Sequence, residues 1–251
     1  MVLQENSLFV VPQRLSVPKL RLFCFPFAGG SAQSYQQWQN YFNQDIELVF
    51  VQLKGRGSRI NEQPHRNMQE LVDELMLYSA YLTEYPYIIF GHSMGALIGY
   101  ALCCQLKKLS LPLPLHFIAS ACRAPHQPYL AEARHTLPHN EFIQALEQLN
   151  GTPAEVLRNK ELMELFEPML RADFSIAETY LAPLVQMPFA FSVLFGDKDS
   201  SVALHQLKAW QELTEKNSDL IALPGEHFFI QQCTKQVISC IQSVISQLAL
   251  R

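Results

Sequence analysis

Apolar residues gather in short continuous runs that recur along the whole chain. Continuous runs, unlike alternating ones, are typical of strands in a parallel sheet that is covered on both faces. The last of these runs, Asp219–Leu223, is weaker than the others. The pattern predicts strands at Leu20–Phe25, Ile46–Leu53, Tyr87–Phe90, Leu115–Ser120, Phe189–Phe195 and Asp219–Leu223.

Helical patterns lie between these runs. Met68–Leu82 and Lys235–Leu248 both place apolar residues at the three-to-four spacing of an amphipathic helix. Strands that alternate with helices predict an α/β fold with a mostly parallel, doubly wound sheet flanked by helices. No internal repeat or linker-like stretch interrupts the pattern, so we expect residues 1–251 to form a single domain.

The segment at about 126–187 breaks this alternation, because it shows helical patterns and no good strand. One helix should begin at Pro138–Glu141 and end at Gly151, and a longer one should cover Lys160–Leu181, interrupted or kinked by Pro168. An all-helical insertion in an α/β sheet is a candidate lid. The alternative is an ordinary helical layer.

Composition narrows the class of protein. The chain is 49% hydrophobic and 17% charged, which argues against disorder, and its net charge of −4 argues against nucleic acid as a partner. The six cysteines form no C-x-x-C pair, so we expect reduced cysteines, no metal site and no metal cofactor. The N-terminus lacks the features of a signal peptide, and the uncharged stretch Tyr85–Leu106 is broken by proline and glycine. We therefore expect a cytoplasmic protein that does not span a membrane.

Gly91-His92-Ser93-Met94-Gly95 carries the strongest chemical signal. It is a G-x-S-x-G motif that follows a predicted strand and precedes a helical stretch, Ala96–Leu106. A serine at such a tight turn projects its hydroxyl from the edge of the sheet, and the backbone N–H of Met94 can face a developing oxyanion. The motif predicts that Ser93 is a catalytic nucleophile, and the alternative is a purely structural turn.

A nucleophilic serine needs a base and an acid that orients the base, in the chain order serine, acid, histidine. Among eight histidines, His227 alone follows the final predicted strand and precedes the last helix. The acid should end the preceding strand, where Asp197 and Asp199 compete. We favour Asp199, because Asp197 directly follows the turn glycine and is better placed to shape that turn.

The second oxyanion donor should come from the loop after an early strand. Pro26-Phe27-Ala28-Gly29-Gly30 follows the first predicted strand, and neither phosphate-binding glycine pattern occurs there. We therefore predict the Ala28 N–H as the second donor. The basic loop Lys54–Arg59 has two interpretations, a solvated loop or a contact for a phosphate or an acidic partner surface.

These motifs resemble those of the type II (external) thioesterases that accompany nonribosomal peptide and polyketide synthases. The resemblance spans about residues 20–230 and includes pieces of the insertion, which generic esterases lack. Some positions depart from the family pattern, namely Lys54, Gly57, Ala101 and Glu226. The segments that carry the resemblance are 25–30 with Trp38, 90–96, 120–126, 149–153, 170–174, 195–199 and 224–229.

The resemblance implies an α/β-hydrolase fold with an inserted helical lid, and it places Ser93, Asp199 and His227 on the family's triad and Ala28 and Met94 on its oxyanion donors. It implies hydrolysis of acyl thioesters on the phosphopantetheine arm of acyl or peptidyl carrier protein domains. The role would be to unload mis-primed or stalled carriers, without a cofactor of its own, and we expect a monomer. The alternatives are a small-molecule carboxylesterase or lipase on the same fold and a non-catalytic module that binds carrier proteins.

Overall fold

A sheet of seven strands forms the middle layer of the protein. The computed structural model describes residues 7–149 and 151–248, and in this part of the chain the strand order is β1-β3-β2-β4-β5-β6-β7. Among the strands of the described residues, β1 alone is antiparallel to its neighbour, through the pair Phe9↔Val51. The mostly parallel sheet confirms the predicted fold class. The strands are β1 Phe9–Val10, β2 Leu20–Phe25, β3 Ile46–Val51, β4 Tyr87–His92, β5 His116–Ser120, β6 Ala190–Gly196 and β7 Ser218–Leu223.

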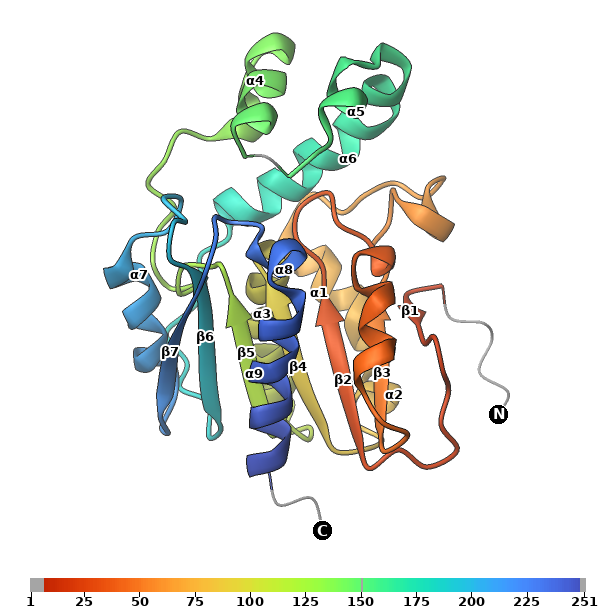
Figure 1. The fold of residues 1–251 in the computed structure, drawn as a ribbon, viewed down its shortest axis with the longest axis vertical. Coiled ribbons are helices and arrows are strands. Elements are labelled where there is room, and N and C mark those ends of the chain that lie inside the picture. The colour runs from red at the N-terminus through yellow and green to blue at the C-terminus, as the bar shows by residue number, and fades with distance from the viewer. Residues whose placement is uncertain (1–6, 150, 249–251) are drawn as a thin grey trace.

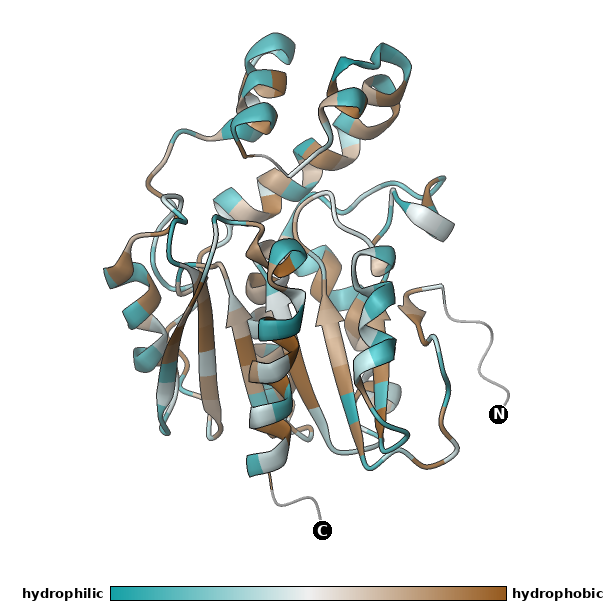
Figure 2. Ribbon diagram, viewed as in Figure 1, coloured by the Kyte–Doolittle hydropathy of each residue, from teal (hydrophilic) through white to brown (hydrophobic). Residues whose placement is uncertain are grey.

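Helices cover both faces of this sheet, with α9 in front of it and α3 behind it in Figure 1. Alternate residues of β2 serve the two sides: Phe23 packs in the core under α3, whereas Leu22 packs in the core under α9. Figure 2 shows the consequence, with mostly hydrophobic strands between helices of mixed character. The covering helices are η1 Ala32–Tyr41, α1 Met68–Met76, α2 Ser79–Leu82, α3 Met94–Lys108, α7 Leu204–Lys208, η4 Ala209–Leu213, α8 Phe229–Gln232 and α9 Thr234–Gln247.

The insertion between β5 and β6 stands above the edge where the parallel strands end (Figure 1). Its α4, α5 and α6 enclose a small core of their own, which is separate from the two cores of the sheet. Pro168 lies inside α6, which runs on as one helix, so the predicted interruption is wrong. The elements between Ser120 and Ala190 are η3 Arg134–Thr136, α4 His139–Leu149, α5 Ala154–Arg158 and α6 Lys160–Thr179. Asn150, part of the predicted 149–153 motif, lies outside the described residues.

Local differences from the sequence prediction concern the ends and breaks of elements. The predicted helix 68–82 is two helices, because the backbone at Tyr78 leaves the helical region and its ring packs edge-on against Phe9. Strand β4 extends through His92, and α3 begins at Met94 instead of Ala96. The short strand β1 was missed, since two residues give no readable pattern. The helices in the described part of the chain are too short or too polar to cross a membrane.

Candidate active site

Ser93 occupies a strained turn between β4 and α3. Its backbone angles are φ 53° and ψ −119°, a region that residues other than glycine rarely adopt. Its N–H donates to the Ser120 carbonyl at 2.7 Å, and its own carbonyl accepts from Ala96 at 3.0 Å. The side chain is partly exposed at the carboxyl edge of the sheet. The turn therefore presents the Ser93 hydroxyl toward the insertion.

The two glycines of the motif allow this turn to close. A Cβ on Gly91 would lie 2.4 Å from the Gly95 carbonyl carbon, and a Cβ on Gly95 would lie 2.1 Å from the Phe25 carbonyl oxygen. Neither distance can be tolerated by a side chain. The start of α3 therefore packs directly on the end of β2, which brings the loop after Phe25 beside Ser93.

His227 lies between Ser93 and Asp199. Its Nε2 is 3.0 Å from the Ser93 Oγ, and its Nδ1 is 2.9 Å from the Asp199 Oδ2. The Asp199 side chain is only 4% exposed, and that of His227 is 16% exposed. The structure thus brings the predicted nucleophile, base and acid into one hydrogen-bonded chain.

The loops that carry His227 and Asp199 touch each other through glycine. A Cβ on Gly196 would lie 2.4 Å from the Gly225 carbonyl oxygen, so a side chain at this position would push the loops apart. The competing carboxylate, Asp197, is exposed and accepts the Gly225 N–H at 2.9 Å. Asp197 therefore shapes the turn and lies outside the hydrogen-bonded chain.

Ser201 is a further member of this network that sequence reasoning missed. Its hydroxyl donates to the Asp199 Oδ1 at 2.5 Å, its N–H donates to the same oxygen at 2.9 Å, and its Oγ is 3.0 Å from the His227 Nδ1. A serine two residues after an aspartate is a common turn signal, which the sequence does show. Burial raises the pKa of Asp199, but the hydrogen bonds from His227 and Ser201 outweigh it and hold that pKa below its ordinary value.

His92 lies beside the site without belonging to the chain of hydrogen bonds. It is fully buried, its Nδ1 is 2.8 Å from the Ser120 Oγ, and its ring centre is 5.5 Å from that of His227. Burial lowers the pKa of His92 far below its ordinary value, and the neighbouring His227 adds to this effect. Both effects favour the neutral form of His92.

The predicted oxyanion donors lie at the two loops that meet beside Ser93. Met94 is the first residue of α3, where backbone N–H groups have no partner within the helix. Ala28 is partly exposed in the loop after β2. Within the described residues, neither the Met94 N–H nor the Ala28 N–H donates to another protein group. Both donors are thus free to bind a negatively charged oxygen.

The two arginines of the basic loop Lys54–Arg59 are buried and not exposed to solvent. Arg56 and Arg59 are each 4% exposed, and each pairs with carboxylates of this chain. The Arg59 guanidinium donates to Glu62 and Glu74 at 2.6 Å. Burial lowers the pKa of Arg59, but Glu62 and Glu74 raise it by more, so this pKa lies above its ordinary value. Neither sequence interpretation holds for these arginines, because their charge is already used inside the fold.

The insertion touches the site at two points. A Cβ on Gly151 would lie 2.3 Å from the Phe228 ring, and that ring packs edge-on against His227 with centres 5.1 Å apart. A Cβ on Gly29 would lie 2.7 Å from the Leu170 side chain of α6. The insertion therefore contacts both the loop of the predicted base and the loop of the predicted oxyanion donor.

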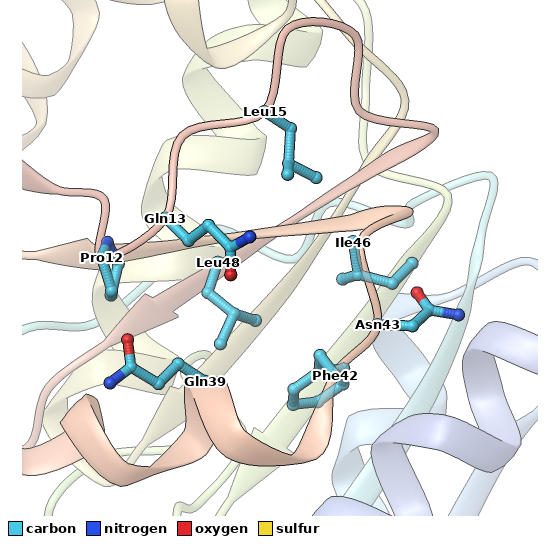
Figure 3. Close-up of a pocket in the computed structure, with 8 residues that line it drawn as sticks. All are labelled: Pro12, Gln13, Leu15, Gln39, Phe42, Asn43, Ile46 and Leu48. Carbon is cyan, nitrogen blue, oxygen red and sulfur yellow. The ribbon is translucent and has the colours of Figure 1, made fainter.

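A cavity elsewhere in the molecule does not compete with this site. It has a volume of about 20 Å³, which is room for about one water molecule. Figure 3 shows that its lining comes from the N-terminal segment, the end of η1 and the start of β3. The described residues also contain no group of three or more His, Cys, Asp or Glu side chains that could hold a metal ion. All six cysteines are free thiols.

Comparison with known proteins places this geometry in a family. Residues 20–245 match the family described as "Thioesterase domain". The chain belongs to the thioesterase family. This thioesterase is 38% identical to the gramicidin S biosynthesis protein GrsT of Aneurinibacillus migulanus over 237 residues, which cover 94% of this chain and 92% of that protein.

Solved structures agree with this assignment. The thioesterase superposes on ClbQ from the colibactin NRPS/PKS pathway with a TM-score of 0.83 and 31% identity, covering 91% of this chain and 98% of that one. It superposes on the type II thioesterase BorB from the borrelidin biosynthetic cluster with a TM-score of 0.86 and 27% identity, covering 96% and 98%. The predicted resemblance to type II thioesterases is confirmed. The protein is a serine-dependent hydrolase of acyl thioesters.

Proposed function

We propose that this thioesterase removes acyl groups from the phosphopantetheine arm of acyl or peptidyl carrier proteins, with Ser93 as nucleophile, His227 as general base and Asp199 as the acid that orients it. The observation that carries the proposal is the continuous hydrogen-bonded chain from the Ser93 Oγ through His227 to Asp199. The carrier substrate is supported by kinship with GrsT, a gramicidin S biosynthesis protein, and with a type II thioesterase of the borrelidin cluster.

The first half of the reaction forms an ester on Ser93. The His227 Nε2 takes the hydroxyl proton as the Ser93 Oγ attacks the thioester carbonyl, and Asp199 stabilises the resulting imidazolium. The oxyanion lies between the N–H groups of Ala28 and Met94, and each such donor contributes on the order of 10²–10³ in rate. The carbon–sulfur bond then breaks, and the thiol leaves with a proton from His227.

The second half releases the acid. Water attacks the acyl ester while His227 takes one of its protons, and the bond to the Ser93 Oγ then breaks as His227 returns that proton to the Ser93 Oγ, which gives a free carboxylic acid and the starting enzyme. A thiol has a pKa of about 8.5, so it leaves with less help from an acid than an alcohol or an amine does. We infer that thioesters react faster than amides of equal size. The scheme uses only side chains and backbone donors, with no metal or cofactor of the protein's own.

We further propose an editing role, in which the protein unloads mis-primed or stalled carriers. Deleting the gene should lower product yield when carriers are mis-primed, and complementation with the Ser93→Ala variant should not restore it. An unchanged yield under mis-priming would contradict the editing role while leaving the hydrolase activity intact.

The experiment that tests the substrate class is hydrolysis of acetyl- and longer acyl-phosphopantetheinyl carrier proteins by the wild type and by Ser93→Ala. We expect turnover that disappears in the variant, and the dependence on chain length measures the depth of the acyl site. Brisk Ser93-dependent cleavage of p-nitrophenyl esters without turnover of any carrier would instead favour a small-molecule esterase.

A further inference from the structure

Arg56 and Asp173 form a buried ion pair between two distant parts of the chain. Arg56 follows β3, and Asp173 belongs to α6 of the insertion. The guanidinium donates to both carboxylate oxygens, at 2.5 and 2.6 Å, and the two side chains are 4% and 2% exposed. A bidentate arginine–carboxylate pair of this kind fixes both groups in one plane.

The same pair also forms hydrogen bonds to the loop after β2, which carries the predicted oxyanion donor Ala28. The Asp173 Oδ2 accepts the Gly29 N–H at 2.7 Å, and the Arg56 Nη1 donates to the Gly30 carbonyl at 3.1 Å. The Gly29 N–H belongs to the peptide group that joins it to Ala28. Fixing this peptide group limits rotation of the backbone at Ala28, and so fixes the direction of the Ala28 N–H.

A role in stability alone accounts poorly for this arrangement. Burying two charges costs solvation, and apolar residues of similar volume often replace such a pair without loss of stability. What apolar side chains cannot supply is an acceptor for the Gly29 N–H, which lies in a loop where Gly29 has a φ of +78°. The pair is therefore suited to holding one loop conformation.

We propose that Arg56 and Asp173 are positioning residues for the oxyanion hole: through Gly29 and Gly30 they aim the Ala28 N–H at the oxygen that develops next to Ser93. Because Asp173 lies on α6, the hole is complete only while the insertion keeps its place against the loop. The proposal rests on the function proposed above for Ala28 and Ser93.

The chain offers a matched control at the opposite edge of the sheet. Arg21 and Glu47 form another buried pair at 2.7 Å, with side chains 6% and 1% exposed. They also bind backbone, because Glu47 accepts the Leu15 N–H at 2.9 Å and Arg21 donates to the Tyr81 carbonyl at 2.7 Å. Arg21 and Glu47 are second residues of β2 and β3, far from the ends of the strands that carry the site. Loss of this pair tests what removing a buried ion pair does by itself.

The test compares Asp173→Ala, which removes the acceptor of the Gly29 N–H, and Arg56→Lys with Glu47→Ala and Arg21→Lys in steady-state hydrolysis of a p-nitrophenyl ester. This substrate uses Ser93 whether or not carrier proteins are the natural substrates, so failure of the carrier proposal does not affect the result. We expect kcat to fall about 10- to 100-fold in the first two variants, less than the loss of an entire donor, with KM changed less than about twofold. The control variants should keep kcat even where their denaturation midpoints fall.

A second measurement reports on the oxyanion itself. A trifluoromethyl ketone accepts the Ser93 Oγ at its carbonyl carbon and places a negatively charged oxygen in the hole, whereas the carboxylic acid product binds without this adduct. The inhibition constant of the ketone should rise in step with the loss of kcat/KM in Asp173→Ala and Arg56→Lys, while product inhibition stays unchanged. Should one of these variants fail to fold, the other is decisive. Folded variants that bind the ketone as the wild type does would overturn the proposal.

Discussion

Asp197 and Asp199 lie two residues apart after β6, and their carboxylates hold different parts of the same neighbouring loop. Asp197 accepts the backbone N–H of Gly225 at 2.9 Å, whereas the Asp199 Oδ2 is 2.9 Å from the His227 Nδ1. Asp197 is exposed, whereas the side chain of Asp199 is almost fully buried. The two aspartates therefore form a natural test and control.

Replacing Asp199 by asparagine should lower kcat for thioester hydrolysis by roughly 10³–10⁴. An amide cannot stabilise the imidazolium of His227, and it favours the wrong tautomer. Asp197→Asn keeps an oxygen that can accept the Gly225 N–H, so its kcat should stay within about threefold of the wild type. Steady-state kinetics on one acyl thioester measures both variants. Equal losses in the two would remove Asp199 from its proposed role.

Ser201→Ala should lower kcat about fivefold, because it removes a hydrogen bond to the charged Asp199 that is worth about 1 kcal/mol at this exposed position. The KM for the substrate should change little, because the hydrogen bonds of Ser201 go to Asp199 and His227 and not to the nucleophile Ser93. The neighbouring Ser200→Ala serves as the control, because among the described residues the hydrogen bonds from this turn to the Asp199 carboxylate and the His227 ring come from Ser201 and not from the exposed Ser200. A kcat equal to that of the wild type in Ser201→Ala would show that the network does not depend on this hydroxyl.

His116 should make the stability of the protein depend on pH. Burial lowers the pKa of His116 from 6.5 to about 4, partly opposed by Asp219, and its Nε2 is 2.9 Å from the Ser192 Oγ. Between these pH values the unfolded chain binds a proton that the folded chain does not, so the free energy of unfolding falls as the pH is lowered from about 6.5 to about 4. The contribution over this window is about 1–3 kcal/mol.

Urea denaturation between pH 4 and pH 7.5 measures this effect. His116→Gln keeps a partner for Ser192 but cannot bind the proton, so its unfolding free energy should change less with pH over the same window. The exposed His205→Gln controls for the loss of a histidine as such. Parallel pH profiles for His116→Gln and the wild type would contradict the prediction.

Gly151→Ala should disturb the contact between the insertion and the loop of His227. The new Cβ would overlap the Phe228 ring at 2.3 Å, so either the insertion or the ring must move. We expect kcat/KM for long acyl thioesters to fall about three- to tenfold. In Gly151→Ala/Phe228→Leu the overlap is relieved, and the effects of the two substitutions should not add. A double-mutant cycle on kcat/KM measures the coupling, and strict additivity would show that the contact does not matter.

Local patterns were enough to predict much of the fold and the core of the site. Ser93 stands in a strand–turn–helix motif whose meaning is carried by five consecutive residues, and His227 was selected by its place after the last strand. The choice of Asp199 over Asp197 rested on one step along a loop, and the structure places Asp199 against His227. The structure brings these three residues into hydrogen-bond distance, and each could be chosen because its signal is contained in a short segment.

Relationships that depend on tertiary packing could not be read in the same way. Arg56 and Asp173 are 117 residues apart, and nothing local marks either as buried. A loop with three basic residues looks solvated in sequence, but Arg56 and Arg59 find carboxylates that the fold brings to them. Pro168 predicted that the helix is interrupted or kinked, and α6 runs from Lys160 to Thr179 without interruption.

The separate core of the insertion has a consequence for how this enzyme can diversify. Phe142 and Leu146 belong to the hydrophobic core of the insertion. Substitutions in this core can therefore change the shape of the insertion above Ser93 without repacking the two cores of the sheet. Selection can therefore retune acyl preference in one module while the hydrolytic module stays constant. Asp173 limits that freedom, because its carboxylate accepts the Gly29 N–H and so joins the insertion to the loop after β2.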